Sequence, residues 1–370
     1  MKKLKHMLTI IFLVTASLLA TCSAYGQDGI PVFDDSTKRD SSLWFKTRYS
    51  ATEDSRVKIQ DSELALSLEE FDLGARLWRN LPQAKTGNQK SKESFMKKQG
   101  PPQGKEENPG IQSKRGFPGI KQLSTSFSYK KRNFEGDAIL PASGDLLPEE
   151  FYNIKAALTY TSISGRRKLW GLRLGFGSAS DEPFHASDLT TTDALFFMSN
   201  PVGERDSWMF FVYYSDNRAV LNHVPLPGFA YMWKPGKKFQ ILAGIPFLAT
   251  KWKPMEKLDF SLSLNPAPGG KAEVVYSVSD TMKIFGVLQT RSESYIRDER
   301  LEYWDRLFYY ESQLQAGTRI LLGKSADFEI SGSYKFDRYI FEGDGYEDRD
   351  TNRISLENGF CLNLVLSIRF

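Results

Sequence analysis

Apolar side chains recur at every second position through most of the chain, and no other feature of the sequence restricts the fold as strongly. In the last ten residues, CLNLVLSIRF, the apolar positions end with Leu364, Leu366, Ile368 and Phe370. Because successive side chains of a strand point to opposite faces, a period of two indicates a strand with one apolar face. Comparable runs occur at 151–162, 169–177, 258–264 and 328–336, and noisier ones include 122–130 and 238–248. The pattern predicts an all-β chain with many strands.

The N-terminus has the layout of a secretory signal peptide. A basic start with three lysines precedes the apolar run Leu8–Ala20, and small residues follow. The run is shorter than the roughly 20 residues that a spanning helix needs, although an N-terminal membrane anchor is the alternative. We expect residues 1–26 to be removed and 27–42 to form a flexible mature N-terminus. A lipidated Cys22 is a second alternative.

Alternation alone fits either a soluble sheet that covers a core or a membrane barrel that faces lipid. Export from the cytoplasm, strands from residue 43 to the end and the terminal strand that closes on Phe370 together favour the barrel. The net charge of +4 is too mild to indicate a nucleic-acid partner. If Cys22 is removed, only Cys361 remains, which excludes an internal disulfide.

The C-terminal strand resembles that of bacterial outer-membrane β-barrel proteins, which present alternating apolar residues and a final Phe to the outer-membrane insertion machinery. The matching positions are Leu364, Leu366, Ile368 and Phe370. Residues 150–370, with DNRAVLNHVPLPGFAYMWKP and ILAGIPFLATKWKP, are similar to a family of outer-membrane barrels of unknown function. The resemblance implies an outer-membrane location, with membrane lipid, the insertion machinery and periplasmic chaperones as partners. It supplies no catalytic residue.

The predicted fold is therefore a transmembrane antiparallel up-and-down β-barrel over residues 43–370, with about 12–14 strands and a range of 12–16. If Phe370 is periplasmic, counting strands backwards places 291–303 and 338–353 outside. The noisy run 238–248 reads as one strand. With this count the loops that carry His185 and His223 are periplasmic. The basic segment 82–119 is then external, and its lack of aliphatic residues predicts a disordered loop.

Polar positions opposite the apolar ones predict side chains that face the lumen. These candidates have both signs of charge, so they could line a water-filled pore or pair into networks that plug it. They are Lys155, Arg173, Asp259, Glu273, Glu329, Lys335 and Arg369.

Aromatic residues near predicted strand ends are typical of the belts that mark a membrane–water boundary. A platform that stacks sugars is the alternative. The residues are Trp170, Trp208, Tyr231, Trp233, Trp252, Tyr303, Trp304, Tyr309 and Tyr310.

The leading functional prediction is a passive pore or transport-like barrel for small solutes, and the alternative is a plugged barrel with a structural or surface-interaction role. A lipid-modifying enzyme is a minor alternative, since a serine nucleophile needs a nearby base and only His185 and His223 follow the signal peptide. We predict no catalytic residue, no cofactor and no metal site. The acidic segment EGDGYEDRD at 342–350 could hold a hard cation, but its spacing is not that of an EF-hand loop and a solvated acidic loop is the preferred interpretation.

Overall fold

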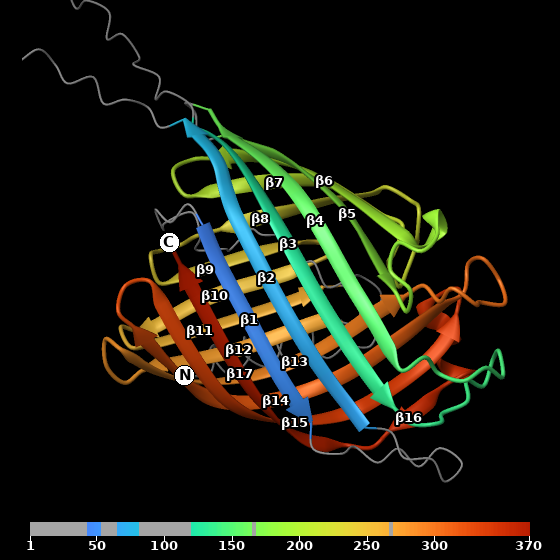
Figure 1. Cartoon of the computed structure of the whole chain (residues 1–370). Helices are drawn as coiled ribbons and strands as arrows, with labels where there is room; N and C mark the ends of the chain where they lie inside the picture. The colour runs from blue at the N-terminus through green and yellow to red at the C-terminus, as the bar shows by residue number, and fades with distance from the viewer. Residues whose placement is uncertain (1–42, 53–64, 81–119, 165–167, 266–268) are drawn as a thin grey trace, which may run out of the picture.

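The computed structural model describes residues 43–52, 65–80, 120–164, 168–265 and 269–370. The predicted signal peptide 1–26, the N-terminus 27–42 and the basic loop 82–119 lie outside these residues. The described residues form one antiparallel sheet that curls into a closed wall of tilted strands (Figure 1). None of the helices in these ranges has the length and apolar character that crossing a membrane requires.

The strands follow one another in chain order, and two short 3₁₀ helices lie between them. The strands are β1 (Leu43–Thr52), β2 (Ala65–Asn80), β3 (Ile120–Glu135), β4 (Glu150–Ile163), β5 (Leu169–Ser180), β6 (Thr190–Val202), β7 (Asp206–Ser215), β8 (Leu226–Trp233), β9 (Phe239–Ile245), β10 (Leu248–Met255), β11 (Leu258–Asn265), β12 (Gly269–Ser277), β13 (Met282–Tyr295), β14 (Arg306–Leu322), β15 (Ala326–Gly343), β16 (Ile354–Leu356) and β17 (Gly359–Arg369). The helices are η4 (Ser187–Leu189) and η5 (Tyr346–Asp350).

The first and last strands close the wall. Strand β1 pairs antiparallel with β2 on one side and with β17 on the other, from Trp44 opposite Arg369 to Thr52 opposite Cys361. Each of the other neighbours in sequence is also a neighbour in the sheet, which is up-and-down order. Closure leaves no sheet edge with unpaired backbone groups, as a wall in contact with lipid requires. The predicted all-β antiparallel barrel is confirmed.

The wall has sixteen strands, at the upper end of the predicted range. Seventeen strand segments are present, but β16 and β17 both pair with β15 and form one interrupted strand. The break at residues 357–358 lies beside Asp337, which has a positive φ of 50°. This irregularity lets one strand accommodate a bend without opening the wall.

The outward face of the wall is apolar. In β5 the side chains of Leu174 and Phe176 are 50% and 53% exposed, whereas a Cβ atom at Gly175 or Gly177 would point inward and meet Asp193 or the Ile154 carbonyl oxygen on the neighbouring strands. The same alternation holds in β17, where Leu362 is exposed and Cys361 and Asn363 are buried. Exposed apolar side chains occur on strands all around the wall. An outer face of this kind is suited to contact with lipid acyl chains.

Exposed aromatic side chains gather near one end of the barrel. Trp170, Trp208, Trp233 and Trp252 lie close to the strand ends nearest Phe370, and the Trp208 and Tyr231 rings are 4.8 Å apart. This is the position of an aromatic belt at a membrane boundary. The prediction was wrong for Tyr309, which is fully buried and faces inward, and Tyr310 stacks on Tyr339.

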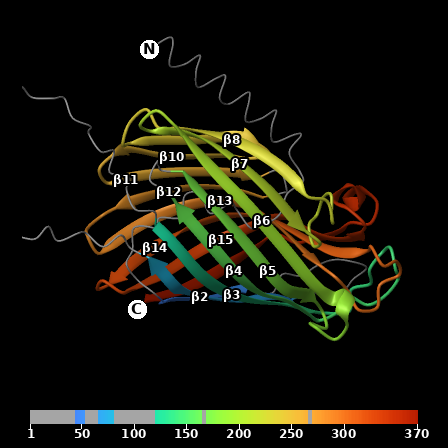
Figure 2. The same ribbon diagram turned by 90° about the horizontal axis from the view of Figure 1, so that it is seen from above.

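The two ends of the barrel differ in their connections. Short turns at 203–205, 256–257 and 323–325 lie at the end that holds Phe370, whereas the longer loops 136–149 and 296–305 lie at the other end (Figure 2). We call these the Phe370 end and the far end.

One missed turn reverses part of the predicted topology. The run 238–248 is not one strand, because β9 ends at Ile245 and the chain turns through Pro246–Phe247 into β10. One additional strand between a loop and the C-terminus moves that loop to the opposite end of the barrel. The loops of His185 and His223 therefore lie at the far end, and Asn80 and Ile120, which flank the basic segment, lie at the Phe370 end. Both placements are opposite to those expected.

Candidate functional site: the lumen and its closed far end

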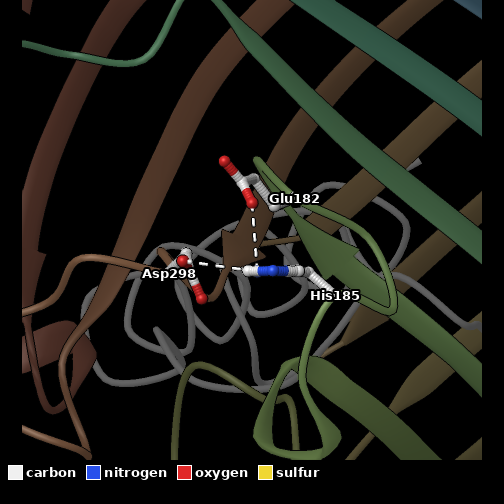
Figure 3. Close-up of side chains that lie close together, drawn as sticks. All are labelled: Glu182, His185 and Asp298. Atoms are coloured by element: carbon white, nitrogen blue, oxygen red, sulfur yellow. Dashed lines mark ion pairs between the residues drawn. The ribbon is translucent and has the colours of Figure 1, made fainter.

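Three ionisable side chains from two loops converge at the far end (Figure 3). His185 Nδ1 lies 3.1 Å from Glu182 Oε2 and 3.6 Å from Asp298 Oδ2. The other histidine, His223, packs edge-on against Trp304. Within the described ranges neither imidazole is hydrogen-bonded to a serine hydroxyl, the contact that a serine nucleophile would need.

Most of the predicted lumen-facing side chains lie in ion pairs on the inward face of the wall. Lys155 Nζ is 2.7 Å from Asp193 Oδ1, and Arg369 is 2.5 Å from Asp327 Oδ1. Arg173 occupies an inward position between the outward Leu172 and Leu174, opposite Leu195. The remaining pairs are Lys253–Asp259, Lys271–Glu273, Arg319–Glu273, Arg319–Glu329 and Lys335–Glu311.

These pairs tie neighbouring strands together across the inner face. Arg319 on β14 is 2.8 Å from Glu329 on β15 and 3.9 Å from Glu273 on β12. One guanidinium therefore contacts carboxylates from two other strands, which holds each long side chain against the wall. The charges on the inner face therefore neutralise one another within the wall.

A second charged cluster is fully buried toward the far end. Glu293 accepts a hydrogen bond from Lys130 Nζ at 3.0 Å, from Arg132 Nε at 2.9 Å and from the Tyr295 hydroxyl at 2.6 Å. The Arg132 guanidinium also lies 3.8 Å from the centre of the Tyr309 ring. Three further side chains around the buried Glu293–Arg132 pair fix β3, β13 and β14 relative to one another.

Sequence reasoning missed this cluster because both strands were predicted too short. The run 122–130 stops before Arg132, and Glu293 was assigned to an external loop at 291–303. The structure continues β3 to Glu135 and β13 to Tyr295. Lys130, Arg132 and Phe134 alternate with their neighbours and could have indicated that the strand continues past residue 130. The pattern was obscured because the inward positions change there from charged to apolar.

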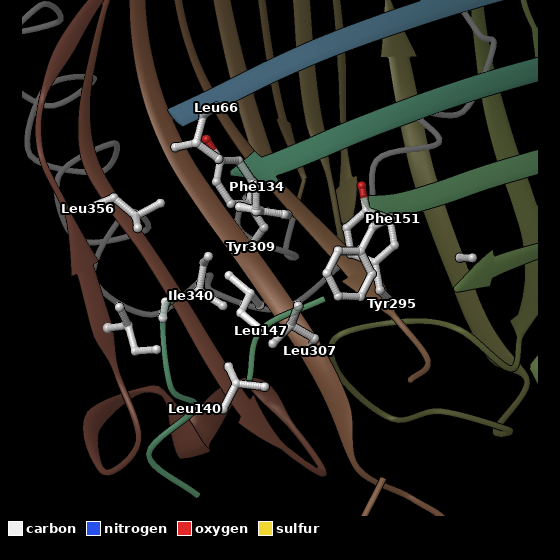
Figure 4. Close-up of a cluster of buried hydrophobic side chains, with 13 residues drawn as sticks. Leu66, Phe134, Leu140, Leu147, Phe151, Tyr295, Leu307, Tyr309, Ile340 and Leu356 are labelled. Carbon is white, nitrogen blue, oxygen red and sulfur yellow. The ribbon is translucent and has the colours of Figure 1, made fainter. Parts of the chain in front are cut away.

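The loop between β3 and β4 packs apolar side chains against the inner face of the wall at the far end (Figure 4). Leu140 and Leu147 from this loop are buried among inward side chains of the wall, including Phe134, Phe151 and Tyr309. The loop is a small hairpin, in which Leu140 N donates to Asp145 O and Leu147 N donates to Ala138 O, each at 2.8 Å. We call residues 136–149 the plug loop.

Polar contacts hold the tip of the plug loop. Ser143 donates from its hydroxyl to Glu342 Oε2 at 2.8 Å, and Arg297 NH2 donates to Asp145 Oδ2 at 2.8 Å. Arg297 also pairs with Glu342, so a single network joins the plug loop to the wall and to the 296–305 loop. The hydrogen bond from Arg297 lowers the pKa of Asp145 below its ordinary value. Glu342, expected in a solvated acidic loop, is instead buried in this network.

A cavity of about 250 Å³ lies on the inner face beside the buried cluster. Side chains of both signs line it, together with serine, threonine and asparagine. The charged members are Glu70, Asp72, Lys130, Lys155, Asp193, Arg218 and Glu293. A space of this size lined by ionisable groups suits water and small polar solutes.

The inner wall next to this cavity is apolar. Inward side chains of β6 to β10, together with Phe247 from the turn between β9 and β10, form one cluster that includes Leu195, Phe211, Met232 and Leu242. Outward side chains of β6 and β7, such as Phe196 and Phe210, are apolar as well. Strand β6 therefore lacks the alternation that marks the rest of the chain, and 190–202 is not among the alternating runs of the sequence.

No protein-family model matches the chain, and no curated protein does either. Among solved structures, the chain is similar to an outer-membrane channel from Pseudomonas putida F1, with 8% identity, coverage of 89% of this chain and 96% of that chain, and a TM-score of 0.35. It is also similar to the translocator domain of the autotransporter NalP from Neisseria meningitidis, with 9% identity, coverage of 99% and 98%, and a TM-score of 0.27. Similarity at this level says nothing about substrate.

The wall itself decides the class of fold. It is closed, has an even number of strands, and carries apolar side chains on its outer face and ion pairs on its inner face. These are the properties of barrels that span the outer membrane. The chain has the fold of an outer-membrane β-barrel protein.

Proposed function

We propose that the barrel is a pore for small polar solutes, located in the outer membrane and closed at its far end by the plug loop. Barrels of 16–18 strands enclose an aqueous channel, whereas barrels of about 8 strands fill with their own side chains. The observation that carries the proposal is the cavity of about 250 Å³ lined by charges of both signs. A barrel with a purely structural role has no need for such a space.

The plug loop is the element that separates an open pore from a closed one. It fills the far end with a few apolar side chains and is held at its tip by Ser143 and Asp145. The wall strands on either side of it are paired with each other independently of the loop. Removal of the loop therefore leaves the closed wall intact while it opens the lumen.

Planar-bilayer conductance tests this function directly. We expect the wild-type chain to give a small steady current, and a variant with residues 139–146 replaced by a short Gly–Ser linker to give a current several times larger. The plugged structural barrel, which is the alternative, predicts no current from either chain. The heat-modifiable gel mobility of both chains serves as the control for folding.

A further inference from the structure

We propose that Glu182, His185 and Asp298 form a binding site for a divalent cation of the Zn²⁺ class at the far end of the barrel. The three side chains offer one imidazole nitrogen and two carboxylate oxygens, all within 4.8 Å of one another. Imidazole with carboxylates is a donor set that zinc, cobalt and nickel accept. The site is separate from the lumen and does not depend on the pore function.

The two distances from the imidazole nitrogen to the carboxylate oxygens are close to the edges of a coordination polyhedron. Metal–ligand bonds of about 2.05 Å at tetrahedral angles place neighbouring ligands about 3.3 Å apart. His185 Nδ1 is 3.1 Å from Glu182 Oε2 and 3.6 Å from Asp298 Oδ2. Figure 3 shows both carboxylates directed at the imidazole.

An ion pair alone explains this convergence less well. A protonated Nδ1 carries a single hydrogen, which can be donated along one direction only, whereas two carboxylates approach this atom from different sides. A divalent ion accepts a lone pair from each of the three atoms and also offsets the repulsion between the carboxylates. Exposure of all three side chains leaves room for water to complete the coordination.

The two loops that carry the ligands are held together by contacts other than the ligands themselves. Ile296 N donates to Ala179 O at 2.7 Å, and Asp298 N donates to Asp181 Oδ1 at 3.0 Å. Arg300 pairs with Asp188 at 2.5 Å on the other side of the site. Because these bonds fix the loop backbones, a cation finds its ligands already close, which reduces the ordering entropy of binding.

The ring before His185 adds a further restraint. Phe184 has a positive φ of 62°, a conformation that non-glycine residues rarely adopt, and its ring stacks on Phe176 with 6.2 Å between ring centres. This packing keeps the turn in place and directs the imidazole toward Asp298. The loop therefore holds a locally unfavourable backbone conformation next to the proposed ligand.

The experiment is a titration of the untagged mature chain in detergent micelles with ZnCl₂, followed by calorimetry, and with CoCl₂, followed by the visible absorption of bound Co²⁺. We expect saturable binding of one ion per chain. His185→Ala should weaken binding about tenfold or more, and Asp298→Asn should weaken it as well. His223→Ala is the matched control, since it removes the other histidine at the same end and should leave binding unchanged.

Two results would overturn the proposal. One is the absence of saturable Zn²⁺ or Co²⁺ binding to the wild-type chain, which would leave a histidine ion pair as the reason for the cluster. The other is binding that persists undiminished in His185→Ala and Asp298→Asn, which would place the ion elsewhere. Heat-modifiable mobility identifies any variant that fails to fold, and Glu182→Gln then replaces it in the comparison.

Discussion

Truncation of a single leucine in the plug loop should open the pore. Leu140 is 0% exposed and packs inside the far end, so Leu140→Ala removes apolar contacts only when the loop is in its closed position. Leucine-to-alanine changes at buried sites typically cost about 2–5 kcal/mol. A short loop can relax around the missing side chain, which favours the lower end of that range.

A loss of about 2 kcal/mol from the closed state raises the ratio of open to closed loop about 30-fold. Adding Leu147→Ala should raise the ratio of open to closed loop further. The second increase should be smaller than the first, because the two leucines pack in one cluster and their effects are not additive. Open probability in planar bilayers measures the ratio directly.

Leu146→Ala is the matched control for this prediction. Leu146 lies in the same loop and loses the same atoms, but its side chain is 62% exposed. We expect its open probability to match that of the wild type. If folded Leu140→Ala and Leu146→Ala barrels conducted equally, apolar burial of the plug loop could not be what closes the lumen.

Three other changes test different parts of the structure. Glu293→Gln leaves Lys130 and Arg132 without their carboxylate and should lower the unfolding free energy by about 3–5 kcal/mol, measured by urea unfolding in micelles. Gly228→Ala places a methyl group 1.9 Å from the Phe211 ring and should cost about 1–3 kcal/mol in the same assay, while Gly286→Ala, with open space around it, should cost much less. The pKa of Asp145 is lowered, so its contact with Arg297 is fully present above the ordinary value of 3.8 and is lost as the pH falls through the lower folded value. Conductance should thus be constant from about pH 7 to 5 and rise only in stronger acid, and Asp145→Asn should abolish that rise.

Period-two alternation predicted the strands, and together with the export signal and the terminal strand ending on Phe370 it predicted the barrel. It identified strands wherever one face is apolar and the other polar, as in 169–177 and 328–336, and the terminal strand pairs with the first strand as a closed barrel requires. It failed at β6, where Leu195 and Phe197 face inward and Phe196 and Met198 face outward. A strand that is apolar on both faces has no period to detect.

The plug loop could not be predicted from the sequence. Residues 136–149 contain Gly, Pro, Ser and Asp, which is typical of an exposed connection. The loop has only a few apolar residues, and they form no run long enough to predict a buried segment. They become a core only because the curved wall brings Leu307, Tyr309 and Ile340 around them from strands distant in sequence.

The proposed cation site could not be predicted either, because its ligands come from loops that are distant in sequence and were assigned to opposite ends of the barrel. The end at which a loop lies depends on the parity of the strands between it and a fixed end, so the unrecognised turn at Pro246–Phe247 moved every earlier loop to the wrong side. His185 was then expected on the side opposite to Asp298, and no residue of the 296–305 loop could be considered as its partner. With the parity corrected, β5 and β13 present their loops at the same end, and the backbone bridge between Ser180 and Ile296 brings the ligands together. Recognition of this two-residue turn thus determines whether the sequence places His185 and Asp298 at the same end of the barrel.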